Sequence, residues 1–139
     1  MKKIRDFVKI INLNREKDFD AVKNGVGYHV GSAVLCHNGD GMRFITYLEF
    51  PAGKVKGNHY HKEKYENMVV IKGEVEAKYY FPNNLDSSYK VTLREGDVVS
   101  IRPGVAHAYL SKEGCSVIEF SPQKYNQSDV YKIDKKGDF

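Results

Sequence analysis

The chain has 139 residues, which suits a single domain, since one domain takes roughly 150 residues. Hydrophobic residues make up 41% and charged residues 29% of the chain, a globular balance that excludes disordered, collagen-like and coiled-coil proteins. The net charge of +4 is mild and its two signs are interspersed, so we expect no nucleic-acid partner.

The N-terminal residues are charged and lead into no apolar run of signal-peptide or membrane-spanning length. We therefore expect a cytoplasmic protein with no membrane partner. In a reducing compartment, Cys36 and Cys115, which both lie in apolar runs, are expected to be buried free thiols. Residues 1–26 are expected to form an extension with a strand and a short helix over 15–23, followed by a domain over 27–122 and a partly frayed C-terminal segment over 123–139.

The remaining pattern is one of short strands. Aromatic and β-branched residues recur in runs that Gly, Pro, Asn and Asp separate, which is typical of an all-β sandwich or barrel. Residues 37–41 favour a hairpin turn, because Asn and Gly tolerate positive φ. The predicted strands cover residues 28–36, 43–50, 59–61, 66–72, 75–81, 89–93, 98–101, 106–110 and 115–120.

Three histidines and one glutamate form a candidate metal site. Side chains alternate faces along a strand, so His59 and His61 point the same way if they lie in one. Glu66 opens a strongly apolar strand, where an inward carboxylate costs several kcal/mol unless it is paired or bound to metal. His107 lies in a later strand. A single histidine in a strand is usually structural, but three imidazoles with one carboxylate suit a divalent first-row metal.

These residues carry a resemblance to the cupin superfamily. Its first motif is matched in full, as G-x5-H-x-H-x4-E-x6-G from Gly53 to Gly73. Its second motif is matched in part by Gly96, Gly104 and His107, while the proline is displaced by one position and Ser111 replaces the closing asparagine.

The resemblance implies an all-β fold, a cupin-type jelly-roll β-barrel, with a metal inside its mouth and a homodimeric assembly. It assigns His59, His61, Glu66 and His107 as the ligands of a divalent ion, which could be Fe, Mn, Zn, Ni or Co. Residues 43–50 and 57–61 also resemble small cupins that are encoded with enzymes of nucleotide-sugar and surface-polysaccharide synthesis.

Three classes of function fit such a site. The first is an isomerase or epimerase acting on a sugar or nucleotide sugar, in which a base removes a proton beside a carbonyl. Tyrosines are candidates for this proton transfer and for binding the ligand. We predict Tyr109 and Tyr47 as catalytic residues, and Tyr60 and Tyr79 as ligand-binding residues. Tyrosine also simply suits half-buried strands. Arg43 and Arg102 are candidates for binding an anionic group.

The second class is a metal-dependent dioxygenase acting on a small molecule, and the third is a small-ligand-binding module without catalysis, since fold does not establish function. An anion-binding cluster would favour a sugar phosphate, and an apolar pocket an aromatic or thiol substrate. The lysine cluster of Lys54, Lys56, Lys62 and Lys64 is predicted to be a solvated rim, or else to steer an anionic substrate to the mouth.

Overall fold

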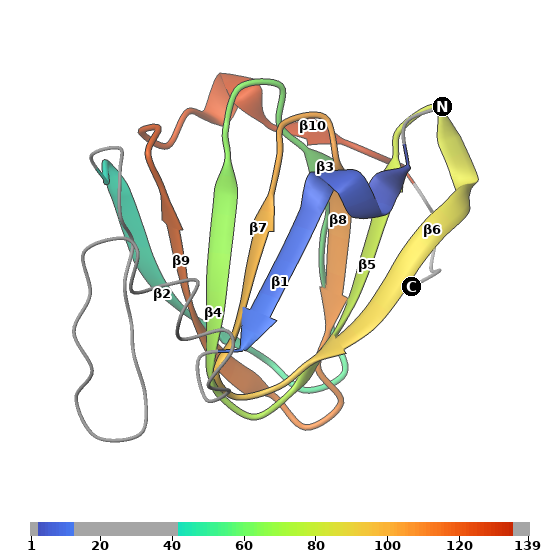
Figure 1. Cartoon of the computed structure of the whole chain (residues 1–139). Helices are drawn as coiled ribbons and strands as arrows, with labels where there is room; N and C mark the ends of the chain where they lie inside the picture. Colours follow the sequence, from blue (N-terminus) through green and yellow to red (C-terminus); the bar gives the residue numbers. More distant parts are fainter. Residues whose placement is uncertain (1–2, 13–41, 135–139) are drawn as a thin grey trace.

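The computed structural model describes residues 3–12 and 42–134, and within them two antiparallel five-stranded sheets face each other (Figure 1). The first sheet has, in spatial order, β1 (Val8–Asn12), β7 (Asp97–Ile101), β4 (Glu66–Lys72), β9 (Cys115–Ser121) and β2 (Phe44–Phe50). The second has β10 (Tyr131–Lys132), β3 (Val55–Tyr60), β8 (Ala106–Leu110), β5 (Val75–Phe81) and β6 (Asn84–Leu93). Two short 3-10 helices, η1 (Ile4–Phe7) and η2 (Gln127–Asp129), precede β1 and β10.

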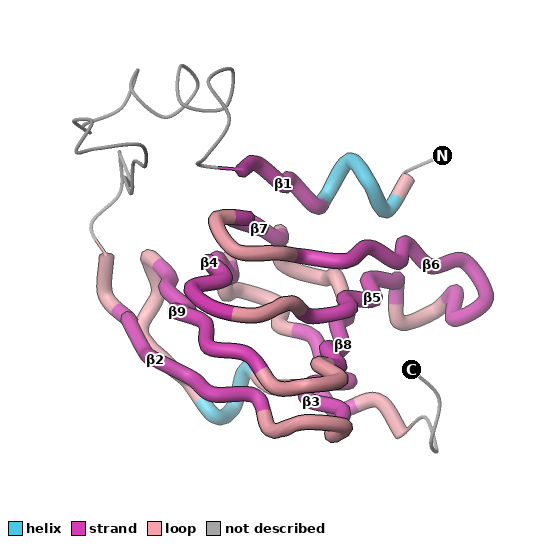
Figure 2. The backbone as a smooth tube through the Cα atoms, turned by 90° about the horizontal axis from the view of Figure 1, so that it is seen from below, coloured by secondary structure: helices cyan, strands magenta, loops and turns pink. Residues whose placement is uncertain are grey.

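The core lies between the two sheets because the strands alternate apolar inward positions with outward ones. In β2, for example, Phe50 is buried and packs in the core, whereas Ile45 and Tyr47 on the opposite face are exposed. Figure 2 shows β2, β9 and β4 on one side of this interior and β3, β8 and β5 on the other. The fully or nearly fully buried core side chains include Met68, Val70, Val75, Tyr79, Leu93 and Val117.

The predicted all-β fold is confirmed, in the form of two facing sheets rather than the closed barrel that the resemblance implied. Two strands are longer than the sequence pattern indicates, because β3 begins at Val55 and β6 at Asn84. The strand predicted over 28–36, the turn over 37–41, the helix over 15–23 and Cys36 lie outside the described residues. Cys115 is a buried free thiol, as expected.

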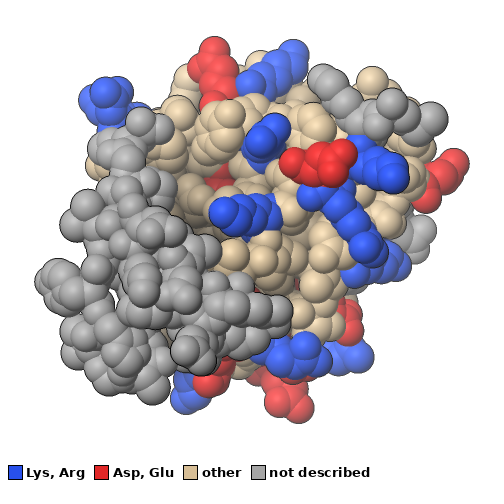
Figure 3. Space-filling model, viewed as in Figure 1, with Lys and Arg blue, Asp and Glu red and all other residues tan. Residues whose placement is uncertain are grey.

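The N-terminal segment contributes a strand to the first sheet. β1 pairs with β7 over five residues, from Val8 opposite Ile101 to Asn12 opposite Asp97. Among the described residues, no helix has the length and apolar character needed to cross a membrane. On the face shown in Figure 3, Lys and Arg side chains lie beside Asp and Glu side chains, so the charge there is mixed.

Candidate metal centre

The four predicted ligands converge between the two sheets. His59 lies on β3 and His107 on β8, directly opposite each other in the register of the second sheet. Glu66 is the first residue of β4 in the first sheet. His61 lies just beyond β3, where the chain crosses from one sheet to the other. One nitrogen or oxygen atom from each residue lies within 4.8 Å of all the others, so the four side chains could hold one ion.

Strand alternation brings the two histidines of the first motif to one side. The ring centroids of His59 and His61 lie 5.0 Å apart. Tyr60 between them points the other way and stacks on Tyr131, with 5.2 Å between the ring centroids. The prediction that His59 and His61 share a face is therefore confirmed.

An irregularity in β3 adjusts how His59 faces His107. The register of β3 against β8 shifts between Gly57 and His59, as in a β-bulge. Gly57 has φ +94, and a Cβ atom there would lie 2.6 Å from the carbonyl oxygen of His107. Only glycine fits both the positive φ and this close approach of two backbones. Asn58 also has positive φ, at 61, and its side-chain oxygen accepts a hydrogen bond of 3.1 Å from the Tyr80 hydroxyl.

Backbone carbonyls determine the tautomers of two of the imidazoles. The Nδ1 atom of His61 lies 2.9 Å from the carbonyl oxygen of Asp129, and that of His107 lies 3.3 Å from the carbonyl oxygen of Val105. A carbonyl only accepts hydrogen bonds, so each Nδ1 carries the proton and donates it. In the neutral ring, the Nε2 atom then presents a lone pair to the site.

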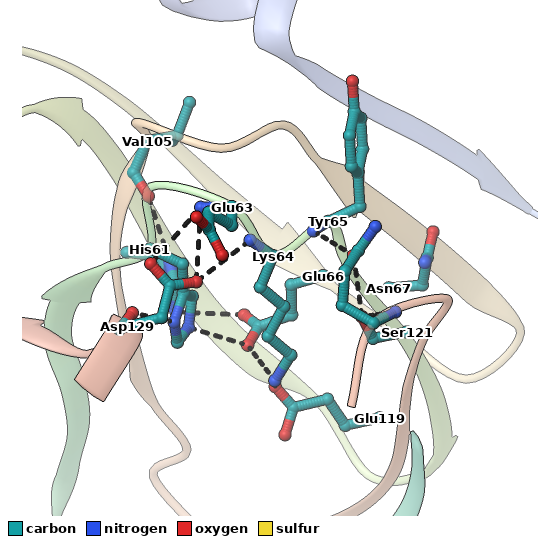
Figure 4. A network of polar contacts seen from close by, with 12 residues as sticks. His61, Glu63, Lys64, Tyr65, Glu66, Asn67, Val105, Glu119, Ser121 and Asp129 are labelled. Carbon is teal, nitrogen blue, oxygen red and sulfur yellow. Dashed lines mark hydrogen bonds and ion pairs between the residues drawn. The ribbon is translucent and has the colours of Figure 1, made fainter. Parts of the chain in front are cut away.

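Both Nε2 atoms face the same carboxylate. The His107 Nε2 atom lies 2.9 Å from Glu66 Oε2. The His61 Nε2 atom lies 3.5 Å from Glu66 Oε1, and Figure 4 shows these two side chains next to each other. The His61 Nε2 atom is buried and has no hydrogen-bond partner. Two lone pairs facing a carboxylate need a positive charge between them, either a proton or a metal ion. The donor set of imidazole nitrogens and a carboxylate therefore fits a divalent first-row ion.

The protonation states of the other two ligands also suit a cation. Burial, reinforced by the neighbouring His107, lowers the pKa of His59 to about 4, so its ring is neutral near pH 7. Burial alone would raise the pKa of Glu66, but His107 and hydrogen bonds to its carboxylate hold that pKa well below its usual range. Neutral imidazoles and an ionised carboxylate are the forms that bind metal.

Two further titratable side chains join the site, and the sequence interpretation missed both. The ammonium of Lys64 lies 3.5 Å from Glu66 Oε1 and 3.7 Å from Glu119 Oε1. Burial and the adjacent Glu66 raise the pKa of Glu119 to about 9. Glu119 could have been recognised, because it has the strand parity of the buried residues Cys115 and Val117.

The prediction of a solvated Lys64 is wrong. Only 7% of its side chain is exposed, whereas Lys54, Lys56 and Lys62 are exposed. The amino-acid pattern carried no signal for this difference, because all four lysines stand in polar surroundings. Lys64 becomes buried because the carboxyl groups of Glu66 and Glu119, both from the first sheet, lie beside its ammonium.

A cavity of about 280 Å³ opens onto three of the four ligands, His59, Glu66 and His107. Its wall is partly apolar, and its lining residues are Leu48, Glu49, Phe50, Lys56, Gly57, His59, Glu66, Met68, His107, Tyr109 and Glu119. Larger surface depressions beside Arg94 and beside Arg43 include none of the four ligands.

Tyr109 is the predicted catalytic residue that the structure places at this cavity. Its ring centroid lies 5.8 Å from that of His107, and its hydroxyl oxygen accepts a hydrogen bond of 3.4 Å from the Tyr79 hydroxyl. Tyr79 is fully buried behind it. Burial raises the pKa of both tyrosines above the usual value, so both remain protonated near neutral pH.

The structure does not bring the other predicted catalytic and binding residues to the cavity wall, namely Tyr47, Tyr60, Tyr79, Arg43 and Arg102. Tyr47 is 58% exposed on the outer face of β2, and its hydroxyl donates to Glu49 at 3.0 Å. Tyr60 faces away from the histidines, and Arg43 and Arg102 are exposed at other points of the surface. Catalytic or binding roles for these residues stay predictions.

Two facing antiparallel sheets with three imidazoles and a carboxylate between them define a small cupin. A family model described as "Cupin domain" matches residues 46–120, more than half of the sequence, and the chain belongs to this family. The sequence matches no curated protein.

Solved structures share the fold at low sequence identity. The sugar 3,4-ketoisomerase QdtA from Thermoanaerobacterium thermosaccharolyticum, solved in complex with TDP, has a TM-score of 0.67 and 15% identity, covering 91% of this chain and 88% of that one. A 3,4-ketoisomerase from Helicobacter canadensis has a TM-score of 0.67 and 14% identity, covering 91% and 90%. The capsular polysaccharide assembling protein CapF from Staphylococcus aureus has a TM-score of 0.61 and 19% identity, covering 80% of this chain and 34% of CapF.

Proposed function

We propose that this cupin is an enzyme that isomerises a sugar or nucleotide sugar with the help of a divalent metal ion. The observation that carries the proposal is the convergence of four ligand atoms within 4.8 Å, one of them the buried His61 Nε2 atom without a hydrogen-bond partner. This cluster lies at a cavity that a small ligand can enter. An unsatisfied polar atom in a buried site calls for a partner from outside the protein.

His59, His61, Glu66 and His107 would hold the ion. A bound divalent ion would polarise a carbonyl oxygen of the substrate. The chain's own contribution is to keep the His59 ring neutral and the Glu66 carboxylate ionised. It also surrounds the ligands with the apolar side chains Leu48, Phe50 and Met68 of the cavity wall.

Tyr109 is the group that we assign to the substrate's reacting oxygen. Its hydroxyl accepts from Tyr79, so its own proton is free to be donated. Because burial raises its pKa, Tyr109 acts as a hydrogen-bond donor to the oxygen that gains negative charge, rather than as the base. We assign no role in this step to Tyr47, which lies outside the cavity.

The size of the cavity supports a sugar ring as the part of the substrate that enters. At about 280 Å³ it is at the lower limit of ordinary ligand pockets, which measure roughly 300–1,000 Å³. The similarity of fold to sugar 3,4-ketoisomerases supports the same class of substrate. A nucleotide would then remain outside the cavity, with Lys56 at its wall as the cationic side chain available to an anionic group.

The first experiment is elemental analysis of untagged protein purified anaerobically without added metal. Near-stoichiometric manganese, zinc, nickel or cobalt would support the isomerase proposal. Absence of metal in folded protein would contradict the metal's part in it. The proton between the ring nitrogens and Glu66 would then be the required positive charge, and the histidines would be acid–base groups.

The second experiment tests the reaction itself. An isomerase that moves a carbonyl to the neighbouring carbon removes a proton from that carbon and returns one to the former carbonyl carbon, with exchange against solvent. In D2O, the protein should therefore place deuterium in TDP-4-keto-6-deoxyglucose, a sugar nucleotide bound by one of the structures of similar fold. Binding without exchange would contradict this substrate's turnover and would favour a binding module.

The apolar part of the cavity wall favours a second candidate, a dioxygenase that acts on a small molecule. Leu48, Phe50 and Met68 line the cavity, whereas the predicted anion-binding residues Arg43 and Arg102 do not. Near-stoichiometric iron with substrate-dependent oxygen uptake would support this function. Absence of oxygen uptake by the ferrous protein across aromatic and thiol substrates would contradict it.

The expected homodimer remains a proposal that rests on the family. Light scattering at micromolar concentration should give twice the chain mass of 15.9 kDa. A mass of one chain would contradict it.

A further inference from the structure

The chain that follows β9 returns across the strand that carries His59. β10 pairs with β3, with Tyr131 opposite Tyr60 and Lys132 opposite His59. The backbone N–H of Ile133 donates a hydrogen bond of 2.8 Å to the Asn58 carbonyl. Helix η2, which ends at Asp129, lies immediately before this pairing, beside the turn that joins β3 to β4.

Asp129 binds that turn with its carboxylate. The side chain is buried and accepts hydrogen bonds from three successive backbone N–H groups of the turn. Figure 4 shows Asp129 beside Glu63 and Lys64 of this turn. Its Oδ1 atom lies 2.9 Å from the nitrogen of Lys62, its Oδ2 atom 3.1 Å from that of Lys64, and both oxygens lie within 3.3 Å of the nitrogen of Glu63. Hydrogen bonds to a charged carboxylate are stronger than neutral ones, so this turn is firmly held.

The backbone of the same residue holds His61. The Asp129 carbonyl accepts from His61 Nδ1 at 2.9 Å, which requires the proton on Nδ1 and leaves the Nε2 lone pair directed at the site. One residue therefore places the turn through its carboxylate and orients the imidazole at the start of that turn through its carbonyl. The same turn continues to Lys64 and Glu66, so it carries three of the charged or ligating groups of the centre.

We infer that Asp129 is the positioning residue of the metal centre: its carboxylate binds the 62–64 turn so that its carbonyl holds His61 with Nε2 facing Glu66. This inference rests on the proposed metal site. Partners of this kind orient a ligating histidine and set its tautomer, and removing one typically costs about 10- to 100-fold in metal affinity. Asp129 touches neither substrate nor ion and has no catalytic role.

Asp97 offers a matched control. It is also a buried aspartate, 9% exposed against 7% for Asp129. It also caps a turn, since its Oδ2 atom accepts from the backbone nitrogen of Arg94 at 2.7 Å. Its other oxygen accepts from the Asn12 side chain at 2.7 Å, and none of its hydrogen bonds reaches the histidines. Asp97→Asn therefore measures how much stability is lost when a buried carboxylate no longer caps a turn, while every contact of the metal centre stays in place.

The experiment compares Asp129→Asn, Asp129→Ala and Asp97→Asn with the unaltered protein. Metal-free samples are titrated with Zn²⁺ against a chromophoric chelator, and stability is measured by urea unfolding. The ring nitrogens of His61 are observed by 15N NMR in the metal-free state. We expect both Asp129 variants to bind Zn²⁺ about 10- to 100-fold more weakly and their His61 ring to lose its single Nδ1–H tautomer. Asp97→Asn should lose stability but keep Zn²⁺ affinity and the tautomer.

The inference is overturned if Zn²⁺ affinity in the Asp129 variants falls no more than in Asp97→Asn at matched stability. It is also overturned if the His61 tautomer stays unchanged in a folded Asp129 variant. Should Asp129→Ala fail to fold, Asp129→Asn carries the comparison. Failure of the proposed function has a different signature: the unaltered protein would bind no Zn²⁺, while the NMR comparison, which needs no metal, would still decide the role of Asp129.

Discussion

At the scale of single residues, Glu66 is the centre of the site's electrostatics. Its carboxylate faces two imidazole nitrogens and the ammonium of Lys64, all within 3.5 Å. Glu66 is almost fully buried, so water screens its interactions with these neighbours only weakly. The charge state of the whole centre therefore depends on which cations lie beside this one carboxylate.

His61→Ala tests the ligand assignment most directly. We expect it to abolish metal binding and to leave the fold largely intact, because Nε2 lacks a hydrogen-bond partner and Nδ1 loses one hydrogen bond, to the Asp129 carbonyl. Elemental analysis and circular dichroism would measure the two effects, with the exposed-site variant Lys112→Ala as control. Full metal occupancy in His61→Ala would show that the assignment of the site is wrong.

Lys64→Met tests the buried ammonium. In metal-free protein the substitution removes the ammonium that lies 3.5 Å from the ionised carboxylate of Glu66. Breaking a buried ion pair costs roughly 3 kcal/mol in the free energy of unfolding. Lys62→Met, two residues away and exposed, should change it by less than about 0.5 kcal/mol. Urea unfolding compares the two, and equal losses would refute a special role for Lys64.

At the scale of elements, the bulge in β3 allows two strands to approach closely where both carry a histidine. Gly57 lies against the backbone of His107, and Asn58 beside it holds the β10 segment through its carbonyl. The geometry of the site thus depends on backbone features of β3 as well as on the ligands.

Gly57→Ala should weaken both stability and metal binding. The new Cβ would lie 2.6 Å from the His107 carbonyl oxygen, which forces β8 and its histidine to shift, and the positive φ adds roughly 1–2 kcal/mol. Gly53→Ala is the matched control, because Gly53 also has positive φ but open space around its Cβ position. Gly53→Ala should lower the stability of the fold without weakening metal binding. Unchanged metal affinity in Gly57→Ala, measured by chelator competition, would contradict the role of the bulge.

At the scale of the whole molecule, the site joins the two sheets. His59 and His107 belong to the second sheet and Glu66 to the first, so an ion bound by all of them links both layers. Binding that is confined to the folded state stabilises it by about 2.7 kcal/mol at a free concentration 100 times the dissociation constant.

When the ion identified by elemental analysis is added to metal-free protein, the melting temperature should accordingly rise by roughly 5–10 °C. Differential scanning calorimetry with and without the ion measures the shift. His61→Ala, which lacks one ligand, should show no such rise. A metal-independent melting temperature in the unaltered protein would contradict a site that spans both sheets.

The sequence by itself determined the local features of this protein. Runs of aromatic and β-branched residues, separated by turn-forming residues, predict nearly every strand of the described residues. The alternation of side chains along a strand places His59 and His61 on one face. The spacing from Gly53 to Gly73 indicates the cupin family, which the family model confirms. These features are readable because they depend on neighbours within a few positions along the chain.

Only the tertiary structure decided which distant residues complete the site. Asp129 lies more than sixty positions from the turn that it binds, and Lys64 is buried because Glu119, from another strand, lies beside Glu66. Tyr47 lies on the outer face of β2, whereas Tyr109, which has the strand parity of His107, reaches the cavity. Such contacts depend on how the strands are ordered and which sheets face each other, and strand periodicity carries no information about either.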